Sequence, residues 1–154
     1  MNADPGVMEF FYEGTMDRAA SDALVDRIEK HFDEKGFRAW AMEVPGVAPF
    51  IGFTGLSVPR FTAHFTPCVE IGWRLAPAYW GRGYATEAAK LALDHGFVPL
   101  ELEEIVSFTA VTNERSRAVM ERIGMRRDPS DDFDYPGIPE GHALRPHVLY
   151  RLRC

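Results

Sequence analysis

The sequence predicts one α+β domain, of the mixed α/β kind, built around a central sheet. The chain has 154 residues, enough for one domain with a genuine core. Apolar periodicity and turn residues predict the element order helix, hairpin, strand, helix, strand, helix, strand, which suits a single sheet with helices packed on it. No repeat, low-complexity tract or interdomain linker interrupts the sequence. We therefore expect residues 1–154 to form one domain.

The first predicted helix runs from Asp17 to Lys35. Asp17 suits the N-cap position, and Gly36 suits the position just after the last turn. Apolar residues recur at four-residue spacing and give the helix one stripe, whereas its other positions, including His31, are expected to be exposed. The stripe consists of Ala20, Leu24, Ile28 and Phe32.

A β-hairpin is predicted after this helix. Phe37–Glu43 and Phe50–Leu56 have the composition of strands, and Pro45-Gly46 between them is a turn signal. Gly52 and Gly55 weaken the second strand without overturning its prediction.

The second half of the chain alternates strands with helices. The third strand ends at Ala76-Pro77, because proline cannot donate a ladder hydrogen bond. The next helix is rich in alanine, and such small residues allow a helix to lie close to a sheet. The predicted elements are the strand Val69–Leu75, the helix Tyr84–His95, the strand Ile105–Ala110, the helix Glu114–Ile123, the polar loop Asp128–Pro146 and the strand His147–Leu152.

Composition narrows the class of protein further. The 23 acidic and 17 basic side chains give a net charge of −6, which argues against a uniformly basic nucleic-acid binder. No apolar run approaches the ~20 residues that span a bilayer, and the start lacks a signal-peptide pattern. Cys68 and Cys154 cannot form a disulfide framework. We expect a cytoplasmic protein that binds neither nucleic acid nor membrane.

The junction between the third strand and the alanine-rich helix is the most informative segment. Its Gly81-Arg82-Gly83 turn permits positive φ and leaves backbone N–H groups uncovered. With the free N–H groups and the dipole of the first helical turn, these would bind a phosphate or pyrophosphate. A turn that only reverses the chain explains the same residues equally well. A dinucleotide fingerprint would need glycine in place of Thr86, so a dinucleotide-binding module is a minor alternative.

Arginines are dense around a second constellation, which begins at Asn113. This asparagine suits an N-cap, a role that needs no further function. Together with Arg82, the nearby arginines would form an anion-attracting patch, although a solvated helix face is the competing explanation. They are Arg115, Arg117, Arg122, Arg126 and Arg127.

The run Trp73–Ala88, WRLAPAYWGRGYATEA, resembles the acetyl-CoA-binding segment of the GNAT superfamily of N-acetyltransferases. It is most similar to the RimJ/RimL-type branch, the ribosomal-protein-alanine/serine acetyltransferase-like enzymes. The similarity extends over nearly the whole chain in one order. Further matches are Asn113, Ser116, Gly124 and Met125, and the stretches Asn2–Pro5 and Phe133–Pro136.

The resemblance implies a GNAT-like fold, with a central, mostly antiparallel sheet flanked by helices. Family members of this type begin with a strand and a helix ahead of the Asn2–Pro5 turn, so both are expected to be missing here. The strand Phe37–Glu43 would then be a sheet edge that needs cover from the N-terminal segment or from the second copy of a homodimer.

The resemblance also implies acetyl-CoA as co-substrate and an amine as acceptor, meeting in a cleft between the splayed strands Val69–Leu75 and Ile105–Ala110. Backbone groups would hold the pantetheine and pyrophosphate, and an N–H near Leu75 would polarise the thioester carbonyl. The implied acetyl-CoA-binding residues are Trp73, Leu75, Gly81, Arg82, Gly83, Tyr84, Ala85, Thr86, Asn113 and Ser116.

Two positions depart from the family pattern. Trp80 stands where the pattern has Gln or Arg, a replacement that is common in the RimJ/RimL-type branch. Met120 stands where many members carry a tyrosine that acts as general acid. Methionine cannot donate a proton, so that role must move or be absent.

Two side chains are therefore candidates for proton transfer. Glu70 is the candidate base for the amine, since an ammonium group with a pKa of about 10 is not a nucleophile. A carboxylate on a solvated strand face is the alternative explanation for Glu70. Ser116 is the candidate proton donor to the thiolate, and a helix residue that only bonds the backbone is its alternative.

The remaining reactive residue types give weaker signals. Cys68 has no motif around it and is expected to be a small core residue rather than an acetylated nucleophile. The histidines lack metal-ligand spacing, so we expect no metal. Phe61, Phe65, Trp73 and Tyr135 would form either an apolar wall or part of the core.

Acceptor selection is expected to fall to Ser57–Pro67, the N-terminal region and Asp128–Pro146. The four carboxylates at the start of the last loop would attract a cationic amine, or would simply be solvated. The acceptor is either a protein N-terminus or a small-molecule amine. A catalytically silent CoA-binding or regulatory domain is the main alternative, favoured by Met120.

Overall fold

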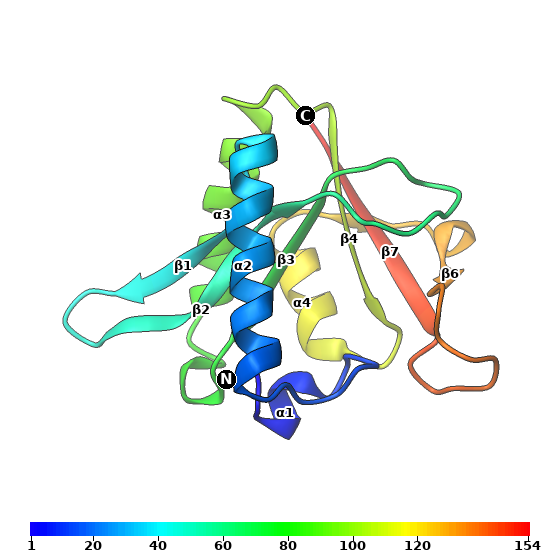
Figure 1. The fold of residues 1–154 in the computed structure, drawn as a ribbon. Coiled ribbons are helices and arrows are strands. Elements are labelled where there is room, and N and C mark those ends of the chain that lie inside the picture. Colours follow the sequence, from blue (N-terminus) through cyan, green and yellow to red (C-terminus); the bar gives the residue numbers. More distant parts are fainter.

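A computed structural model of the chain describes residues 1–154 and shows one seven-stranded sheet (Figure 1). The strand order is β1-β2-β3-β4-β7-β5, and β6 pairs with β7 beside this path. All pairs are antiparallel except β3 with β4. This confirms the expected mixed α/β fold. The strands are β1 (Ala39–Val44), β2 (Ala48–Ser57), β3 (Glu70–Leu75), β4 (Glu104–Ala110), β5 (Arg126–Arg127), β6 (Phe133–Asp134) and β7 (Pro146–Arg153).

The parallel pair β3 and β4 is joined at one end only. Glu70 opposite Val106 is the one residue pair in register between these strands. The amide of Val106 donates to the carbonyl of Val69 at 2.9 Å, and the Ser107 hydroxyl donates to the carbonyl of Ile71, also at 2.9 Å. Beyond Ile71 the two strands separate, so the centre of the sheet has an opening.

Two helices and the sheet enclose the main core. Helix α3 (Tyr84–Phe97) and helix α4 (Glu114–Arg122) lie on one face, where the buried Ala89 and Met120 pack against Ile71 and the other apolar side chains of that face. Ala89 and Ala92 are essentially inaccessible, which confirms that alanines let α3 approach the sheet closely.

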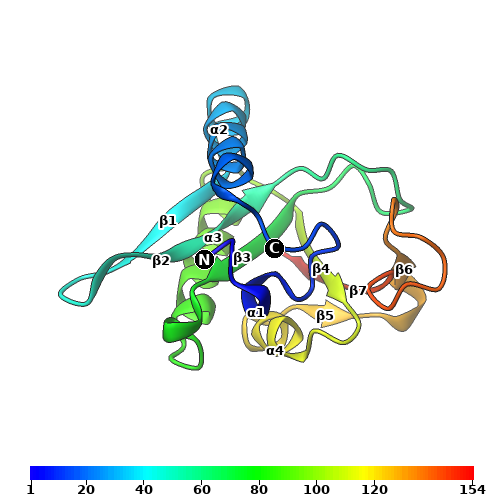
Figure 2. The same cartoon turned by 60° about the horizontal axis from the view of Figure 1, so that its bottom comes forward.

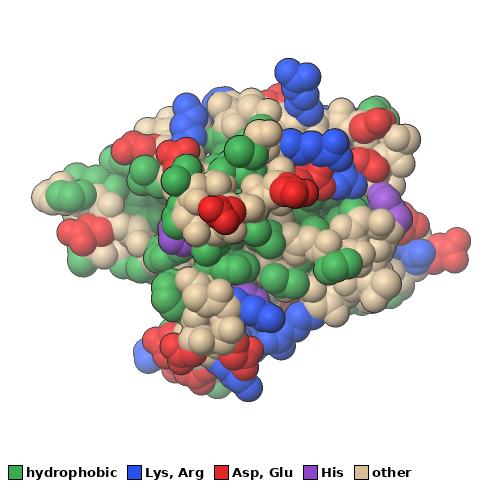
Figure 3. All heavy atoms as spheres, turned by 90° about the horizontal axis from the view of Figure 1, so that it is seen from above, with side chains coloured by type: hydrophobic (Ala, Val, Ile, Leu, Met, Phe, Trp, Pro, Cys, Tyr) green, Lys and Arg blue, Asp and Glu red, His purple; other side chains and the backbone are tan.

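Helix α2 (Arg18–Lys35) lies on the opposite face of the sheet, as Figures 1 and 2 show. Asp17 caps its first turn and Gly36 follows its last, as the sequence predicts. The helix stands away from the sheet, and in Figure 3 its end forms a projecting lobe whose visible surface is largely charged. Val25 and Phe32 remain 49% and 41% exposed. This loose packing leaves space between α2 and the sheet.

His31 corrects the sequence prediction, because it is the one buried side chain of α2 and not an exposed one. Its ring meets Phe37 edge-on at 5.8 Å between centroids, and burial lowers the pKa of its imidazole. His31 lies on the same side of the helix as Leu24 and Ile28, three residues after Ile28, and this polar residue packs the helix against the segment that leads into β1.

Short elements were missed by the sequence reading. The turn at the start of the chain is a helix, α1 (Pro5–Met8), in which the Asp4 carboxylate accepts the amides of Gly6 and Val7 at 2.8 and 3.1 Å. The polar loop after α4 contains β6 and a 3-10 turn, Pro129–Asp131. Two-residue strands are too short to show a periodicity of two.

Strand β1 is the outermost strand on the side of the hairpin, as the resemblance implied. Gly55 of β2 lies directly against its start: a Cβ atom there would overlap the carbonyl oxygen of Arg38 and lie 2.5 Å from the Cα of Ala39. Its φ of 159° adds to this requirement for glycine. None of the helices combines the length and apolarity needed to cross a membrane.

Candidate active site

A cleft of about 1450 Å³ passes through the opening between β3 and β4. Its walls come from the N-terminal segment, β3, β4, the first turns of α3 and α4, and the segments on the α2 side of the sheet. It therefore has two sides, one toward the start of α3 and the other toward α2.

The α3 side offers uncapped backbone amides. Gly83 is the N-cap residue of α3, with φ of 86°, and no side chain caps this helix. A Cβ added to Gly81 or Gly83 would meet no atom within 4 Å, so their backbone borders open space. The first-turn residues of the helix line the cleft. Such free amides, with the helix dipole, suit a pyrophosphate.

Arg82 behaves differently from its neighbours in the glycine-rich turn. It is exposed and is absent from the wall of the cleft, although Gly81, Gly83 and Tyr84 belong to it. The structure thus brings the expected backbone donors together at the start of α3 and leaves the Arg82 guanidinium in solvent.

Strand β3 turns backbone groups into the opening. The amide of Ala76 donates to Ile51 of β2 at 2.9 Å, and backbone groups alternate sides along a strand. The amides of Trp73 and Leu75 therefore point toward β4, beyond the place where β4 separates. Trp80 holds this edge, because its indole N–H donates to the carbonyl of Leu75 at 2.9 Å.

The start of α4 places Asn113 and Ser116 in the cleft wall. Both polar atoms of the Asn113 side chain make a hydrogen bond within the chain: its oxygen accepts the Ser116 amide at 3.2 Å, and its Nδ2 donates to the Thr109 hydroxyl at 2.9 Å. It is therefore an N-cap that fixes the helix relative to β4. The Ser116 hydroxyl makes no hydrogen bond within the chain, so it is available to a ligand.

The expected arginine patch is divided between several places. Arg115 and Arg122 line the cleft, and Arg115 pairs with Glu9 at 2.8 Å and stacks over the Trp80 ring at 4.4 Å. Arg117 bonds the carbonyl of Val111. The two remaining arginines form β5, at the far edge of the sheet. The prediction that these arginines form one anion-attracting patch is therefore wrong.

Glu70 begins β3 and faces the α2 side of the cleft. The Ser57 hydroxyl donates to its Oε2 at 3.4 Å. Burial raises the pKa of Glu70 to about 8, although this donor and the charge of Arg38 both favour the carboxylate. Glu70 is half-buried, which argues against a fully solvated strand face as its explanation, and its raised pKa lies close to neutral pH.

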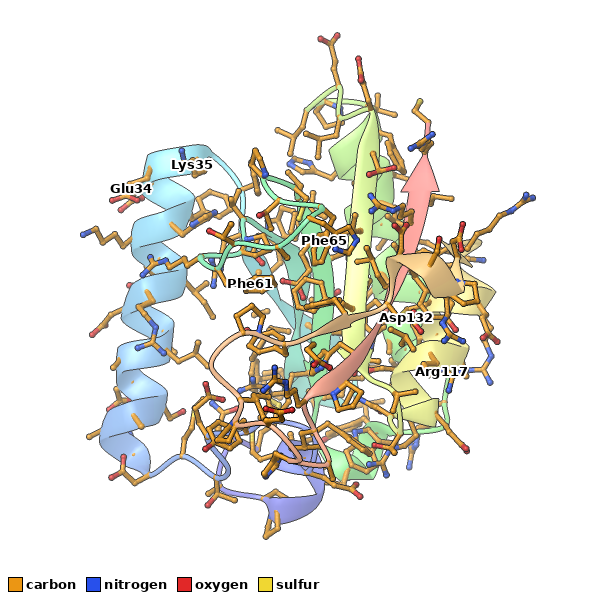
Figure 4. The ribbon with its side chains drawn as sticks, turned by 90° about the vertical axis from the view of Figure 1, so that its right-hand side faces the viewer. Glu34, Lys35, Phe61, Phe65, Arg117 and Asp132 are labelled. Atoms are coloured by element: carbon orange, nitrogen blue, oxygen red, sulfur yellow. The ribbon has the colours of Figure 1, made fainter.

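Aromatic side chains line the same side of the cleft. Phe61 and Tyr135 lie 4.9 Å apart, and Tyr135 lies 4.9 Å from the ring of His147. All three line the cleft with Trp73, whereas Phe65 is buried in a core cluster with Val106. Figure 4 shows Phe61 and Phe65 on the β2–β3 loop; in this view they lie between α2 on the left and Arg117 on the right.

The four carboxylates of the last loop have internal partners, which argues against their role in attracting a cationic acceptor. Asp128 accepts the amide and hydroxyl of Ser130. The other three form ion pairs: Asp131 with Arg151, Asp132 with Arg127, and Asp134 with Arg145. Figure 4 shows Asp132 away from α2 and the α2 side of the cleft.

Cys68 is partly buried and bears no partner suited to activating a thiol. Burial and the nearby Glu70 raise its pKa to about 11, so it stays protonated near neutral pH. No group of three or more His, Cys, Asp or Glu side chains is arranged to hold a metal ion.

Arg38 and Arg74 are cleft residues that the sequence reading missed. Arg74 lies four residues after Glu70 on the same strand, and side chains at even spacing share one face of a sheet. The alternation of side chains along the predicted strand was therefore a signal from which Arg74 could have been predicted as a cleft residue. Arg38 precedes β1 in a loop, where no periodicity applies.

Comparisons with known proteins agree with this geometry. Residues 1–126 match the family model of the acetyltransferase (GNAT) domain. The chain is 33% identical over 122 residues to YkkB of Bacillus subtilis, with 79% of this chain and 69% of that protein aligned. It is 41% identical over 83 residues to the N-acetyltransferase YnaD of the same species, covering 54% of this chain and 47% of that protein. The chain thus spans about half the length of YnaD.

Solved structures agree as well. A GNAT-family acetyltransferase from Bacillus anthracis superposes with a TM-score of 0.77 at 28% identity, over 99% of this chain and 84% of that one. The spermidine N-acetyltransferase of Vibrio cholerae, solved with CoA and spermine, superposes with a TM-score of 0.73 at 20% identity, over 99% of this chain and 85% of that one, which shows a shared fold. The expected N-acetyltransferase class and its use of acetyl-CoA are confirmed at the level of the family. The chain belongs to the GNAT family of acetyltransferases.

Proposed function

We propose that this chain transfers the acetyl group of acetyl-CoA directly to a primary amine. The observation that carries the proposal is the opening between β3 and β4, because it joins free backbone amides on one side to Glu70 on the other. Acetyl-CoA supplies the activated acetyl group, and the products are the acetylated amine and the free thiol of CoA.

The chain binds the donor through its backbone in this proposal. The amides from Gly81 to Thr86 hold the pyrophosphate at the start of α3, and the backbone of Trp73 and Leu75 holds the pantetheine. The Leu75 amide, aimed toward the opening, polarises the thioester carbonyl. Trp80 fixes the position of Leu75 through its indole hydrogen bond. This support explains how tryptophan serves where the family pattern has Gln or Arg.

Glu70 removes the proton that the amine must lose. Its pKa of about 8 means that about one molecule in ten carries the carboxylate at pH 7. A base with a pKa close to the working pH combines a usable ionised fraction with a strong tendency to accept the proton. Its place on the α2 side puts the acceptor on the face of the sheet opposite α3.

Ser116 donates a proton to the thiolate of CoA as it leaves. Its hydroxyl lines the cleft and is free of internal partners. Met120, at the position of the tyrosine found in many family members, is 1% exposed and carries no proton to donate. Ser116 lies one helical turn earlier on the same face of α4, which is where a substitute donor is needed.

The acceptor is either a protein N-terminus, as the RimJ/RimL-type resemblance implies, or a small-molecule amine, as for the spermidine N-acetyltransferase of the same fold. A wall of Phe61, Tyr135 and His147 surrounds the position of the amine. These rings fit the apolar part of either kind of acceptor.

Release of the CoA thiol from acetyl-CoA, measured against a panel of small amines and short peptides, tests this proposal. We expect acetylated product in the wild type and a rate lowered on the order of tenfold to a hundredfold in Ser116→Ala, while acetyl-CoA still raises the melting temperature of the variant. Ser130→Ala, exposed and outside the cleft, is the matched control. A wild type that is stabilised by acetyl-CoA but acetylates no amine would instead be the silent CoA-binding domain.

A further inference from the structure

On its α2 side, β3 carries two charged residue types separated by a glycine that has no side chain. Glu70, Gly72 and Arg74 share this face, because they alternate with Ile71 and Trp73, which belong to the core on the α3 side. A Cβ added to Gly72 would meet no atom within 4 Å. The strand therefore provides an open floor, about 13 Å long from Glu70 to Arg74 at about 3.3 Å per residue.

Arg74 is held in place at one end of this floor. Its guanidinium carbon lies 4.1 Å from the centroid of the Phe11 ring and 5.3 Å from that of Phe53, and its Nη1 donates to the Asn2 side chain at 3.0 Å. Its Nε is buried and has no hydrogen-bond partner. Burial lowers the pKa of Arg74 to about 10, so the side chain is still charged at neutral pH.

Arg74 makes no ion pair, and the charge of Glu13 acts on it only from beyond contact distance. No carboxylate oxygen lies within 4.0 Å of Arg74 or of the three other arginines on this side of the cleft, Arg27, Arg38 and Arg60, although seven arginine–carboxylate pairs form elsewhere in the chain. The carboxyl groups on this side are Glu13 and Glu70, and Glu70 is largely protonated at pH 7. Arg38 and Arg74 are partly buried, whereas Arg27 and Arg60 are exposed, and partly buried charges are normally paired.

We propose that the acceptor is a primary amine that also carries an anionic group, a carboxylate or a phosphate, which Arg74 binds while the amine lies near Glu70. This inference rests on the proposed acetyl transfer and narrows its substrate class. The planar guanidinium suits two-pronged recognition of either anion, and its two flanking rings limit its rotation. A polyamine would place a second ammonium group against unpaired arginines and is disfavoured by their charge.

An alternative is that Arg74 only anchors the N-terminal segment through Phe11 and Asn2. The two roles differ in what a substitution changes. Loss of an anchor lowers stability and slows every acceptor alike, whereas loss of an anion contact weakens only acceptors that carry the anion, and does so mainly through KM.

Steady-state kinetics with matched acceptors tests the inference. The probes are 4-aminobutanoate, its uncharged amide, putrescine and 3-aminopropyl phosphate, together with tripeptides that differ by Glu against Gln. Among the small amines, we expect the better of 4-aminobutanoate and 3-aminopropyl phosphate to have a kcat/KM at least tenfold above that of the uncharged amide in the wild type, and putrescine to have the lowest. Among the tripeptides, the one with Glu should exceed the one with Gln by at least the same factor. Arg74→Gln should reduce this ratio to within threefold, and Arg74→Lys should keep part of it. The carboxylate and phosphate probes identify which anion is preferred.

Arg18→Gln is the control, since Arg18 lies outside the cleft and pairs with Asp22 on the exposed side of α2. A preference for putrescine, or an equal loss for every acceptor in Arg74→Gln, would overturn the inference. If acetyl-CoA binds but no probe is acetylated, the proposed function fails separately. In that case the melting temperature is measured with glutarate and with inorganic phosphate, in the presence of CoA. A rise in the wild type that is absent or smaller in both Arg74→Gln and Arg74→Lys supports an anion site. Equal rises in all three proteins contradict it.

Discussion

Glu70 and Arg74 occupy two ends of the same strand face, and burial shifts their pKa values in opposite directions. Glu70 has one weak donor, Ser57, and burial raises its pKa to about 8. Arg74 keeps its proton even though burial lowers its pKa to about 10. At neutral pH this side of the cleft therefore carries net positive charge, and the charge falls only as pH rises through 8.

The pH dependence of kcat/KM should identify Glu70 as the base. The ionised fraction of Glu70 falls tenfold for each pH unit below its pKa, so the wild-type plot of log kcat/KM should gain one unit of slope below about pH 8. The amine adds its own dependence, which both proteins share. In Glu70→Gln, whose amide resembles the protonated carboxyl group in shape, that unit of slope should vanish. Parallel profiles for the two proteins over pH 6 to 9 would remove Glu70 from the base role.

At the residue scale, the sequence allowed the candidate catalytic residues to be named but not their surroundings to be predicted. Glu70 and Ser116 were identifiable by their chemistry and by their place in a resembling pattern. The raised pKa of Glu70 was not, because it comes from burial, and the segments that bury Glu70 are distant from it in sequence. The internal ion pairs of the acidic loop were unforeseen for the same reason, since Asp131 meets Arg151 twenty residues away.

At the scale of elements, the glycines of β2 have a clear structural role. The sequence suggests that they weaken the strand, yet a Cβ atom at Gly55 would lie only 2.5 Å from the Cα of Ala39, at the start of β1. Long elements were predictable, because α2 and α3 each repeat their periodic pattern over several turns, and α2 lies between the recognisable caps Asp17 and Gly36. Helix α1 has a single turn, and its signal was Asp4 followed by proline at the first helical position.

Gly55→Ala should therefore lower the free energy of unfolding by about 3 kcal/mol, because the new methyl group overlaps the Arg38 carbonyl and must adopt an unfavourable φ. Gly72→Ala is the matched control on the next strand: nothing lies within 4 Å of the added carbon, and a change within about 0.5 kcal/mol is expected. Chemical denaturation of both variants gives the comparison. Equal losses would show that the close approach of β1 and β2 is not what requires glycine at position 55.

The whole molecule brings distant segments to one opening. The N-terminal segment, β3, the α3 junction, β4 with the start of α4, and the loop before β7 all line the cleft. The fold class and the order of these segments followed from the sequence, since they depend on local periodicity. The separation of β3 from β4 did not follow from periodicity alone and was implied by the resemblance. It depends on how two strands distant in sequence are paired, and only the structure shows that they join at one end, around Glu70 and Val106.

Hydrogen exchange measured with and without acetyl-CoA tests most directly whether this opening is the donor site. If acetyl-CoA binds there, exchange should slow at the amides of Trp73 and Leu75 and at those from Tyr84 to Thr86, where no helical or side-chain partner protects them. The amides of α2 should exchange at the same rate in both samples, because that helix lies across the sheet from the α3 junction. Protection confined to other segments, in a sample whose melting temperature acetyl-CoA raises, would contradict the account.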